Sequence, residues 1–354
     1  MVKTLSIVEI IEKSGRNEKI SRDEVVELLS IKKKEDISEL FAAASSIRDK
    51  MFGKKVFIYG FVYFSTHCRN NCAFCFYRRT NRPPRYRKTE DEVLVLSHSL
   101  KDAGINLVDL TMGEDPVMCA DDYSEFLNIV RRVRDEVNIS IMASPGAVPE
   151  GSFEKFRDAG TDWFACYQET YNRELFSKLR LEQDFDNRLN QKIWAKKAGM
   201  LSEDGIMVGL GETFEDRADS ILKMGSLGCE QIRAMTFVPQ KGTPMENVKP
   251  TEPIDELISI AVMRVLFRDR LIPASLDVEG IAGLKSRLDA GANVITSIVP
   301  PHEDLAGVAQ HELDINNGRR SVEHVMHMLD EMGKKAATCT EYESFLKKLK
   351  ANNK

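Results

Sequence analysis

Eight short runs rich in β-branched and aromatic residues alternate with amphipathic helical stretches between residue 56 and about residue 300. This alternation predicts an α/β fold with a parallel sheet, because each helix carries the chain back to the start of the next strand. Four helical stretches end in Ala-Gly, where glycine supplies the left-handed conformation that ends a helix. The runs are VFIYGFVYFS, NLVDLTMG, SIMASPG, WFACYQE, GIMVGL, QIRAMTFVP, PASLDV and VITSIVP, and the glycines are Gly104, Gly160, Gly199 and Gly291.

Eight such units in about 245 residues match a (β/α)8 barrel, which typically takes about 250 residues. A doubly wound sheet is the alternative, because the sequence does not show whether the first and last strands pair. Helical spacing in VEIIEKS and, behind a Ser21 cap, in DEVVELLSI predicts an N-terminal helical extension over 1–55. HVMHMLDEM and EYESFLKKLK predict helices in a C-terminal cover and tail over 301–354. We expect one α/β domain, a (β/α)8 TIM barrel over 56–300 with helical extensions at both ends.

The charge balance excludes several classes of partner. Lys and Arg number 50 and Asp and Glu 55, for a net charge of −5, so the chain lacks the broad basic field that nucleic-acid binding needs. No apolar run reaches the roughly 18 to 20 residues that span a membrane. The first residues, MVKTLSIVEIIEKSGRNEK, contain no uncharged segment typical of a signal peptide. We expect a cytoplasmic protein that binds neither nucleic acid nor membrane.

Three of the seven cysteines crowd into the segment CRNNCAFC directly after the first predicted strand. Cys68, Cys72 and Cys75 have the spacing C-x3-C-x2-C. Three thiolates can hold three corners of a [4Fe–4S] cluster and leave one iron open for a further ligand, whereas electron-transfer clusters normally have four cysteines. The carboxyl ends of the strands are also where barrel enzymes place their active sites. The segment predicts an iron–sulfur cluster with an open coordination position.

A structural zinc site is the alternative use of these thiols. It needs a fourth Cys or His at close spacing, and the candidate is His67, since the next cysteine is Cys119. A non-catalytic scaffold held by iron–sulfur or zinc would lose its metal when His67 is changed. We expect no such loss.

Charged residues in three of the predicted strands face the interior of the predicted barrel. Residues two apart in a strand share a face, so Asp109 points inward with Thr111, and Arg233 points opposite to its apolar neighbours. Ser275 and Asp277 point inward by the same alternation. An unpaired charge in a barrel core is costly, so these groups must pair with one another or with a ligand. The alternatives are an internal ion pair between Arg233 and an Asp, or a substrate with one carboxylate and two ammonium groups.

The motif C-x3-C-x-aromatic-C, with Phe74 at the aromatic position, resembles the signature of the radical S-adenosylmethionine (SAM) enzymes. The resemblance implies a [4Fe–4S] cluster whose open iron binds the amino and carboxylate groups of SAM. It also implies an external one-electron donor, whose electron cleaves the cofactor to a 5′-deoxyadenosyl radical. The protein then positions the reactants and excludes water, and the cofactors supply the chemistry.

Other segments resemble the biotin-synthase and hydrogenase-maturase branch of this family. In that branch a Gly-Glu pair after the second strand receives the cofactor ammonium, which implies a role for Glu114; the sequence does not show whether Glu114 or Asp115 enters the site. Glu169 and Arg188 correspond to residues that contact the ribose or methionine portion. Ser144, at the end of the third strand, is a further expected contact.

From about residue 50 to 340 the chain resembles the methylornithine synthase family, the lysine mutases that open pyrrolysine biosynthesis. The supporting stretches are CRNNCAFCFYRRTNRPPRYRKT, LTMGEDPVM, MVGLGETFEDR and PASLDVEG. The resemblance implies an isomerase that converts L-lysine to (3R)-3-methyl-D-ornithine by radical cleavage of the Cα–Cβ bond and recombination. On this interpretation Arg233 binds the lysine carboxylate, Asp109 and Asp277 bind ammonium groups, and Ser275 assists.

A different radical SAM activity remains as the enzymatic alternative. Sulfur insertion of the biotin-synthase type uses a second cluster in the barrel, and the positions of the other cysteines do not favour one. These are Cys119, Cys166, Cys229 and Cys339. An activity of the hydrogenase-maturase type stays open, and the inward Asp109, Arg233 and Asp277 argue instead for an amino-acid pocket.

Overall fold

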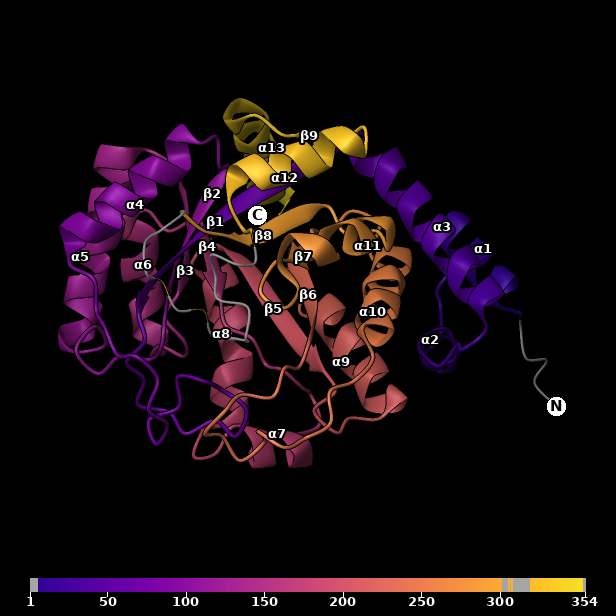
Figure 1. Ribbon diagram of the computed structural model, residues 1–354, viewed down its shortest axis with the longest axis horizontal. Helices are drawn as coiled ribbons and strands as arrows, with labels where there is room; N and C mark the ends of the chain where they lie inside the picture. Colours follow the sequence, from indigo (N-terminus) through magenta and orange to yellow (C-terminus); the bar gives the residue numbers. More distant parts are fainter. Residues whose placement is uncertain (1–5, 301–304, 306, 308–318, 353–354) are drawn as a thin grey trace.

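The computed structural model describes residues 6–300, 305, 307 and 319–352, and a parallel sheet curved into a barrel forms its centre (Figure 1). The order along the sheet is β6-β5-β4-β3-β2-β1-β8-β7, so β1 pairs with both β2 and β8. This pairing of the first and last strands confirms the barrel and excludes the doubly wound sheet. The strands are β1 (Lys55–Ser65), β2 (Leu107–Met112), β3 (Ser140–Ser144), β4 (Trp163–Ala165), β5 (Leu201–Val208), β6 (Gln231–Thr236), β7 (Pro273–Ser275) and β8 (Val294–Ile298).

The barrel is nearly closed, and its weak seam lies between β6 and β7. The two strands meet through an isolated parallel bridge between Gln231 and Leu271, at the amino ends of the strands. All eight predicted strands are present. The fifth begins earlier than predicted, at Leu201 instead of Gly205, because its first residues read LSED and look polar.

Helices surround the barrel on its outer face, as expected for right-handed strand–helix–strand units (Figure 1). The four Ala-Gly glycines all have the left-handed conformation predicted for them, with φ between +87° and +107°. The outer helices are α4 (Glu90–Asp102), α5 (Ser124–Arg132), α6 (Phe153–Ala159), α7 (Arg173–Leu179), α8 (Phe185–Lys197), α9 (Phe214–Ser226), α10 (Pro253–Leu266) and α11 (Leu284–Asp289). Short 3-10 turns cover Asp121–Tyr123, Glu150–Ser152 and Gly280–Gly283, and a π turn covers Val133–Val137.

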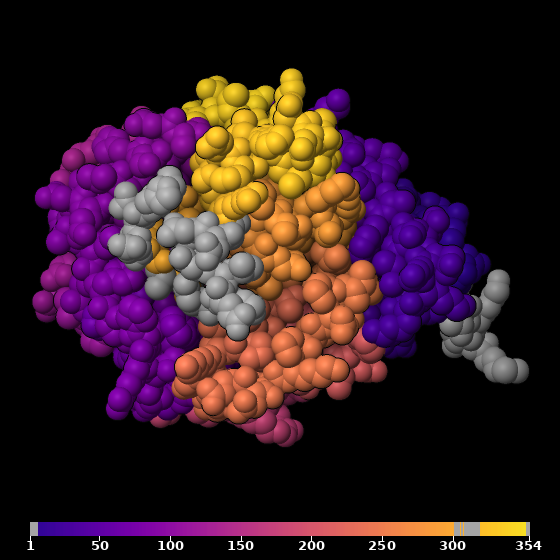
Figure 2. Space-filling view, viewed as in Figure 1, coloured from indigo at the N-terminus to yellow at the C-terminus, as the bar shows by residue number. Residues whose placement is uncertain are grey.

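Three helices precede the barrel and pack along one flank of it, drawn in indigo in Figures 1 and 2. They are α1 (Ile7–Gly15), α2 (Arg22–Leu29) and α3 (Lys34–Phe52). Ser21 caps α2 as predicted, since its side chain accepts the Glu24 backbone N–H. The Ser14 hydroxyl ties α1 to α10 by donating to the Val265 carbonyl oxygen over 2.6 Å. None of the described helices is long and apolar enough to cross a bilayer.

The C-terminal elements comprise α12 (Val322–Glu331), β9 (Lys335–Ala336) and α13 (Cys339–Asn352). α12 begins beside the end of β8, where the Val299 backbone N–H donates to the Arg320 carbonyl oxygen, whereas β9 pairs with the start of β1 and α13 lies at the amino ends of the barrel strands. Tyr342 of α13 reaches under the barrel, where its hydroxyl lies 3.1 Å from the Tyr59 hydroxyl and 2.9 Å from Trp163 Nε1. Both predicted C-terminal helices therefore exist, and α13 covers the base. Parts of the predicted cover, residues 301–304, 306, 308–318 and 353–354, lie outside the described residues.

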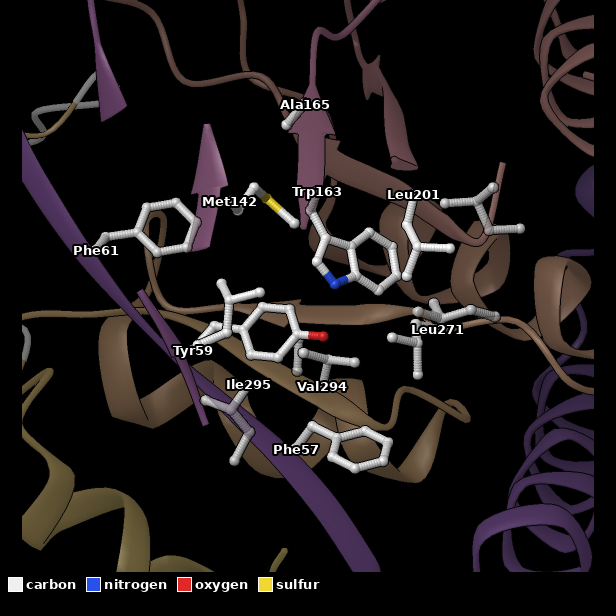
Figure 3. Close-up of a cluster of buried hydrophobic side chains, with 14 of the residues drawn as sticks. Phe57, Tyr59, Phe61, Met142, Trp163, Ala165, Leu201, Leu271, Val294 and Ile295 are labelled. Atoms are coloured by element: carbon white, nitrogen blue, oxygen red, sulfur yellow. The ribbon is translucent and has the colours of Figure 1, made fainter. Parts of the chain in front are cut away.

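The hydrophobic core lies between the sheet and its helices, and part of it fills the barrel lumen near the amino ends of the strands (Figure 3). Large side chains from the first residues of the strands meet there, with Tyr59, Trp163 and Leu201 almost fully buried. Phe61, one pleat higher on β1, already lines a cavity. The base is thus sealed by packing, and open space remains at the carboxyl ends of the strands.

Candidate active site

The three cysteines of the loop after β1 face one cavity. All three are free thiols. The loop lies directly against the end of β2, where Gly113 makes the approach possible. A Cβ atom at Gly113 would lie 2.3 Å from the His67 carbonyl oxygen and 2.8 Å from Cys68 Cβ. The glycine after β2 is therefore required by the path of the cysteine loop.

The chemistry of this cavity fits a cluster with three protein ligands. Neither His67 nor a fourth cysteine is among the residues that line it. Gln183 Nε2 lies 3.0 Å and Arg180 Nη1 3.6 Å from the Cys72 sulfur, and such donors stabilise thiolates that bind iron. Among the described residues, no three His, Cys, Asp or Glu side chains are grouped to hold a single metal ion. The three cysteines therefore share one cavity with donors suited to thiolates, and they are the residues that would hold a cluster there.

Glu114 lines this cavity and Asp115 does not, which answers the question that the sequence left open. The Glu114 carboxylate accepts the Ala147 backbone N–H over 3.0 Å. Gly146, with φ +85°, makes room for it, since a Cβ there would lie 2.2 Å from Glu114 Cγ. Asp115 is fully buried in a bidentate pair with Arg87, both contacts at 2.6 Å. Asp115 therefore ties the segment after β2 to Arg87.

Glu169 and two arginines form the opposite wall. Glu169 follows β4 with φ +68°, which is a strained conformation for a residue with a side chain. Its Oε1 accepts Arg180 Nη2 over 2.5 Å. Arg188 also lines the cavity, but its Nε donates to the Tyr167 carbonyl oxygen and its Nη1 lies 3.6 Å from Glu114 Oε1. The partner of Glu169 is thus Arg180, which the sequence did not indicate because nothing in FSKLR distinguishes it from a surface residue.

A second cavity occupies the upper lumen of the barrel. It shares six lining residues with the first, so the two cavities adjoin. Asp109, Arg233 and Asp277 line this second cavity, as the strand alternation predicted. Ser275 does not line it, and its hydroxyl lies 3.1 Å from Asp277 Oδ2. The six shared residues are Phe74, Cys75, Thr111, Ser144, Tyr167 and Glu169.

Arg233 forms an internal ion pair, but its partner is not an Asp. Its Nε donates to Glu203 Oε1 over 2.8 Å, and both side chains are buried. Glu203 was missed because the start of β5 looked polar. One half of the guanidinium stays available, since Arg233 Nη2 is buried without a hydrogen-bond partner. The guanidinium also lies 5.3 Å from the centre of the Tyr167 ring.

Asp277 is already surrounded by donors, which the sequence did not indicate. Arg320 Nη2 and the Tyr63 hydroxyl both lie 2.8 Å from Oδ1, and the Ser297 hydroxyl lies 2.6 Å from Oδ2. Burial opposes ionisation of this carboxyl, yet the Arg320 charge and these hydrogen bonds outweigh it and lower its pKa. Asp277 is therefore a paired, ionised carboxylate.

The pKa of Asp109 is shifted in the opposite direction from that of Asp277. Burial raises the pKa of its carboxyl to about 7. The Ser144 hydroxyl, which donates to Oδ1 over 2.7 Å, opposes this rise, and the negative charge of Glu203 adds to it. Asp109 is thus the carboxyl of this lumen that gains most from a cationic ligand.

Comparison with known proteins agrees with this arrangement. The family model described as "Radical SAM superfamily" matches residues 62–224. The 3-methylornithine synthase of Methanosarcina barkeri is 43% identical over 319 residues, which cover 90% of this chain and 91% of that enzyme. The [FeFe] hydrogenase maturase subunit HydE of Thermotoga maritima is 34% identical, over 81% of this chain and 82% of that protein.

A crystal structure of methylornithine synthase superposes with a TM-score of 0.90 at 41% identity and covers 95% of this chain and 99% of that one. A crystal structure of the maturase HydG has a TM-score of 0.81 at 21% identity, which shows the shared fold alone. The cysteine loop, the barrel and these relatives lead to one conclusion. The chain is a radical SAM enzyme and belongs to the family of the 3-methylornithine synthases.

Proposed function

We propose that this protein rearranges L-lysine to (3R)-3-methyl-D-ornithine in pyrrolysine biosynthesis. The observation that carries the proposal is the charged lumen, with Asp109, Arg233 and Asp277 on its wall, which adjoins the cysteine cavity. The names of the relatives support the same assignment. We also infer a cytoplasmic location, because the three thiols must stay reduced to bind iron.

Cys68, Cys72 and Cys75 are the residues that would hold the [4Fe–4S] cluster, and SAM would occupy the cavity beside it. When bound and reduced by an external one-electron donor, these cofactors supply a 5′-deoxyadenosyl radical. The chain contributes Glu114 for the cofactor ammonium. Further contacts come from Phe74, Ser144, Glu169, Arg180 and Arg188, all on the wall of the same cavity.

The charges of the lumen complement lysine. Asp109, Glu203 and Asp277 oppose Arg233 and Arg320, which leaves one negative charge when all five groups are ionised. Lysine carries two ammonium groups and one carboxylate, so its net charge is positive. The unpaired Nη2 of Arg233 suits the carboxylate, and Asp109 and Asp277 suit the ammonium groups.

The rearrangement that fits these contacts begins from a substrate radical at Cγ. Cleavage of the Cα–Cβ bond then gives a glycyl radical and an aminobutene, and joining at the internal alkene carbon gives a primary radical that regains a hydrogen atom. The glycyl fragment keeps the carboxylate and the butene keeps the side-chain ammonium. Arg233 on one side and a carboxylate on the other would keep both fragments within reach.

The test is conversion of 13C-labelled lysine by the iron-reconstituted protein with SAM and dithionite under anaerobic conditions. Because the product is an isomer of lysine, we would separate derivatised amino acids by chromatography and follow a new methyl signal by 13C NMR. Cys72→Ala should abolish the product. Cys339→Ala changes an exposed cysteine on α13 and serves as the matched control. Cleavage of SAM with lysine unchanged would reject the assignment and favour the hydrogenase-maturase type.

A further inference from the structure

Arg320 lies beyond the eight strand–helix units, yet its guanidinium is buried in the wall of the lumen. Its Nε donates to the Ser297 carbonyl oxygen over 2.8 Å, and its Nη2 lies 2.8 Å from Asp277 Oδ1 and 3.1 Å from the Tyr63 hydroxyl. Its own carbonyl oxygen accepts the Val299 backbone N–H over 3.1 Å. A residue from the C-terminal extension thus bonds directly to a carboxylate of the cavity.

Ser297, on β8, is held in an unusual conformation by the same contacts. It is fully buried with φ +66°, in the left-handed region that residues with a side chain rarely adopt. Its carbonyl group faces Arg320 while its hydroxyl donates to Asp277 Oδ2 over 2.6 Å. Strain of this kind persists where surrounding contacts fix the conformation, and here they fix the position of Asp277.

The charge of Asp277 depends on Arg320. Among the described residues, the charged and titratable groups that act on Asp277 are Tyr63, Tyr77, Arg233 and Arg320. The two tyrosines are neutral, and Arg233 is engaged with Glu203. Loss of Arg320 would leave Asp277 buried without a cation of its own, which favours the protonated form.

We propose that Arg320 and Ser297 are positioning residues that keep Asp277 ionised and turned toward the lumen, and so set the affinity for a substrate ammonium group. The proposal rests on the proposed function in its choice of ligand. It places a determinant of lysine affinity in the C-terminal extension, outside the barrel.

The first test is the pH dependence of KM for lysine in loaded enzyme. In Arg320→Gln we expect KM to rise about tenfold relative to wild type at pH 6.5 and less at pH 8.5, where Asp277 is ionised again, with a smaller change in kcat. Dividing the KM of the variant by the KM of wild type at each pH cancels the effect of Asp109 ionisation, which is common to both proteins. Arg320→Lys should restore most of the affinity. Arg319→Gln changes the exposed neighbour and is the matched control.

The second test needs no lysine. Burial without Arg320 should raise the Asp277 pKa above its unfolded value, so the loss of stability in Arg320→Gln should grow as pH rises from 5 to 8. Asp277→Asn in that background should recover Tm at pH 8, by on the order of 5 °C, and clearly less at pH 5. If the wild-type protein does not convert lysine, the proposed function is rejected, but the stability test of Arg320 and Asp277 remains valid because it uses no lysine.

Ser297→Gly is a second variant that should fold, because glycine accepts φ +66°. It removes the hydroxyl that bonds Asp277 and should raise KM while keeping Tm. The proposal is overturned if Arg320→Gln loses stability equally at both pH values without recovery by Asp277→Asn, or if its KM ratio to wild type is independent of pH.

Discussion

Two aspartates of one lumen differ in charge because their neighbours differ. Asp277 faces an arginine and three hydroxyl groups, whereas Asp109 faces no cation as close, accepts the Ser144 hydroxyl, and lies near Thr111 and the negative Glu203. The first is stabilised as a carboxylate, whereas burial raises the pKa of the second to about 7, so that it is only partly ionised near neutral pH. A ligand ammonium would therefore gain more from Asp109 than from Asp277.

Asp109→Asn should stabilise the ligand-free protein at high pH. The folded pKa of about 7 exceeds the ordinary value of 3.8, so ionisation destabilises the fold progressively as pH rises from about 4 to 7. The shift of about three units corresponds to a gain of up to about 4 kcal/mol for the variant at pH 8 and none at pH 4. Urea unfolding of the iron-free protein at both pH values measures this gain.

Asp102→Asn, on the exposed end of α4, is the control and should leave stability unchanged at both values. Asp109→Asn should also weaken lysine binding by loaded enzyme, since the amide has no charge to offer an ammonium. A gain in stability that is equal at pH 4 and pH 8 would contradict the titration of Asp109.

Strand alternation was sufficient to place Asp109, Arg233 and Asp277 on the cavity wall, because it depends only on the two-residue period of a strand. It could not identify Glu203 or Arg320. Glu203 sits in a polar strand start that resembles a loop, and Arg320 reaches the lumen from a segment outside the repeating units. Contacts of that kind depend on tertiary packing, which has no local signature.

At the scale of elements, the cysteine loop depends on the end of β2. A Cβ at Gly113 would overlap the His67 carbonyl oxygen, and backbone cannot move aside as a flexible side chain can. We predict that Gly113→Ala displaces the loop and loses most of the bound iron after reconstitution, as measured by iron assay and visible absorption.

Gly151→Ala is the matched control for this loop, because a methyl group at Gly151 would have no neighbouring atom within 4 Å and the φ of this residue is not positive. It should bind iron as wild type does. Full iron content in Gly113→Ala would show that the loop tolerates a shift, and the close approach would then have no part in cluster assembly.

The repeating elements were predictable because strands and helices differ in their hydrophobic period and four of the helices end in a glycine signal. The seam between β6 and β7 was not, since closure depends on how the ends of a twisted sheet meet, as the single bridge from Gln231 to Leu271 shows. The early start of β5 escaped prediction because Glu203 and Asp204 are charged yet fully buried. Burial of charge follows from partners that lie far away in the sequence.

At the scale of the molecule, the two ends of the barrel have separate tasks. The carboxyl ends of the strands carry the cysteines and the charged lumen, while α13 covers the amino ends. Tyr342 of α13 contacts Tyr59 and Trp163, which are labelled in Figure 3. The sequence predicted helices in the C-terminal segment without showing which end they cover. The C-terminal segment thus covers the amino ends of the strands with α13 and also contributes Arg320 near their carboxyl ends.

Tyr342→Phe tests whether the packing at the amino ends of the barrel strands contributes to stability without affecting catalysis. The ring still packs against Phe57, but Trp163 Nε1 and the Tyr59 hydroxyl lose their partner in a dry environment, which should cost about 1 to 3 kcal/mol in the free energy of unfolding. Ser344→Ala, an exposed change two residues along α13, should cost much less. Because the base lies at the opposite end from the cysteine loop, kcat of loaded enzyme well below Tm should stay unchanged. A fall in kcat with normal iron content would show instead that packing at the base shapes the lumen above it.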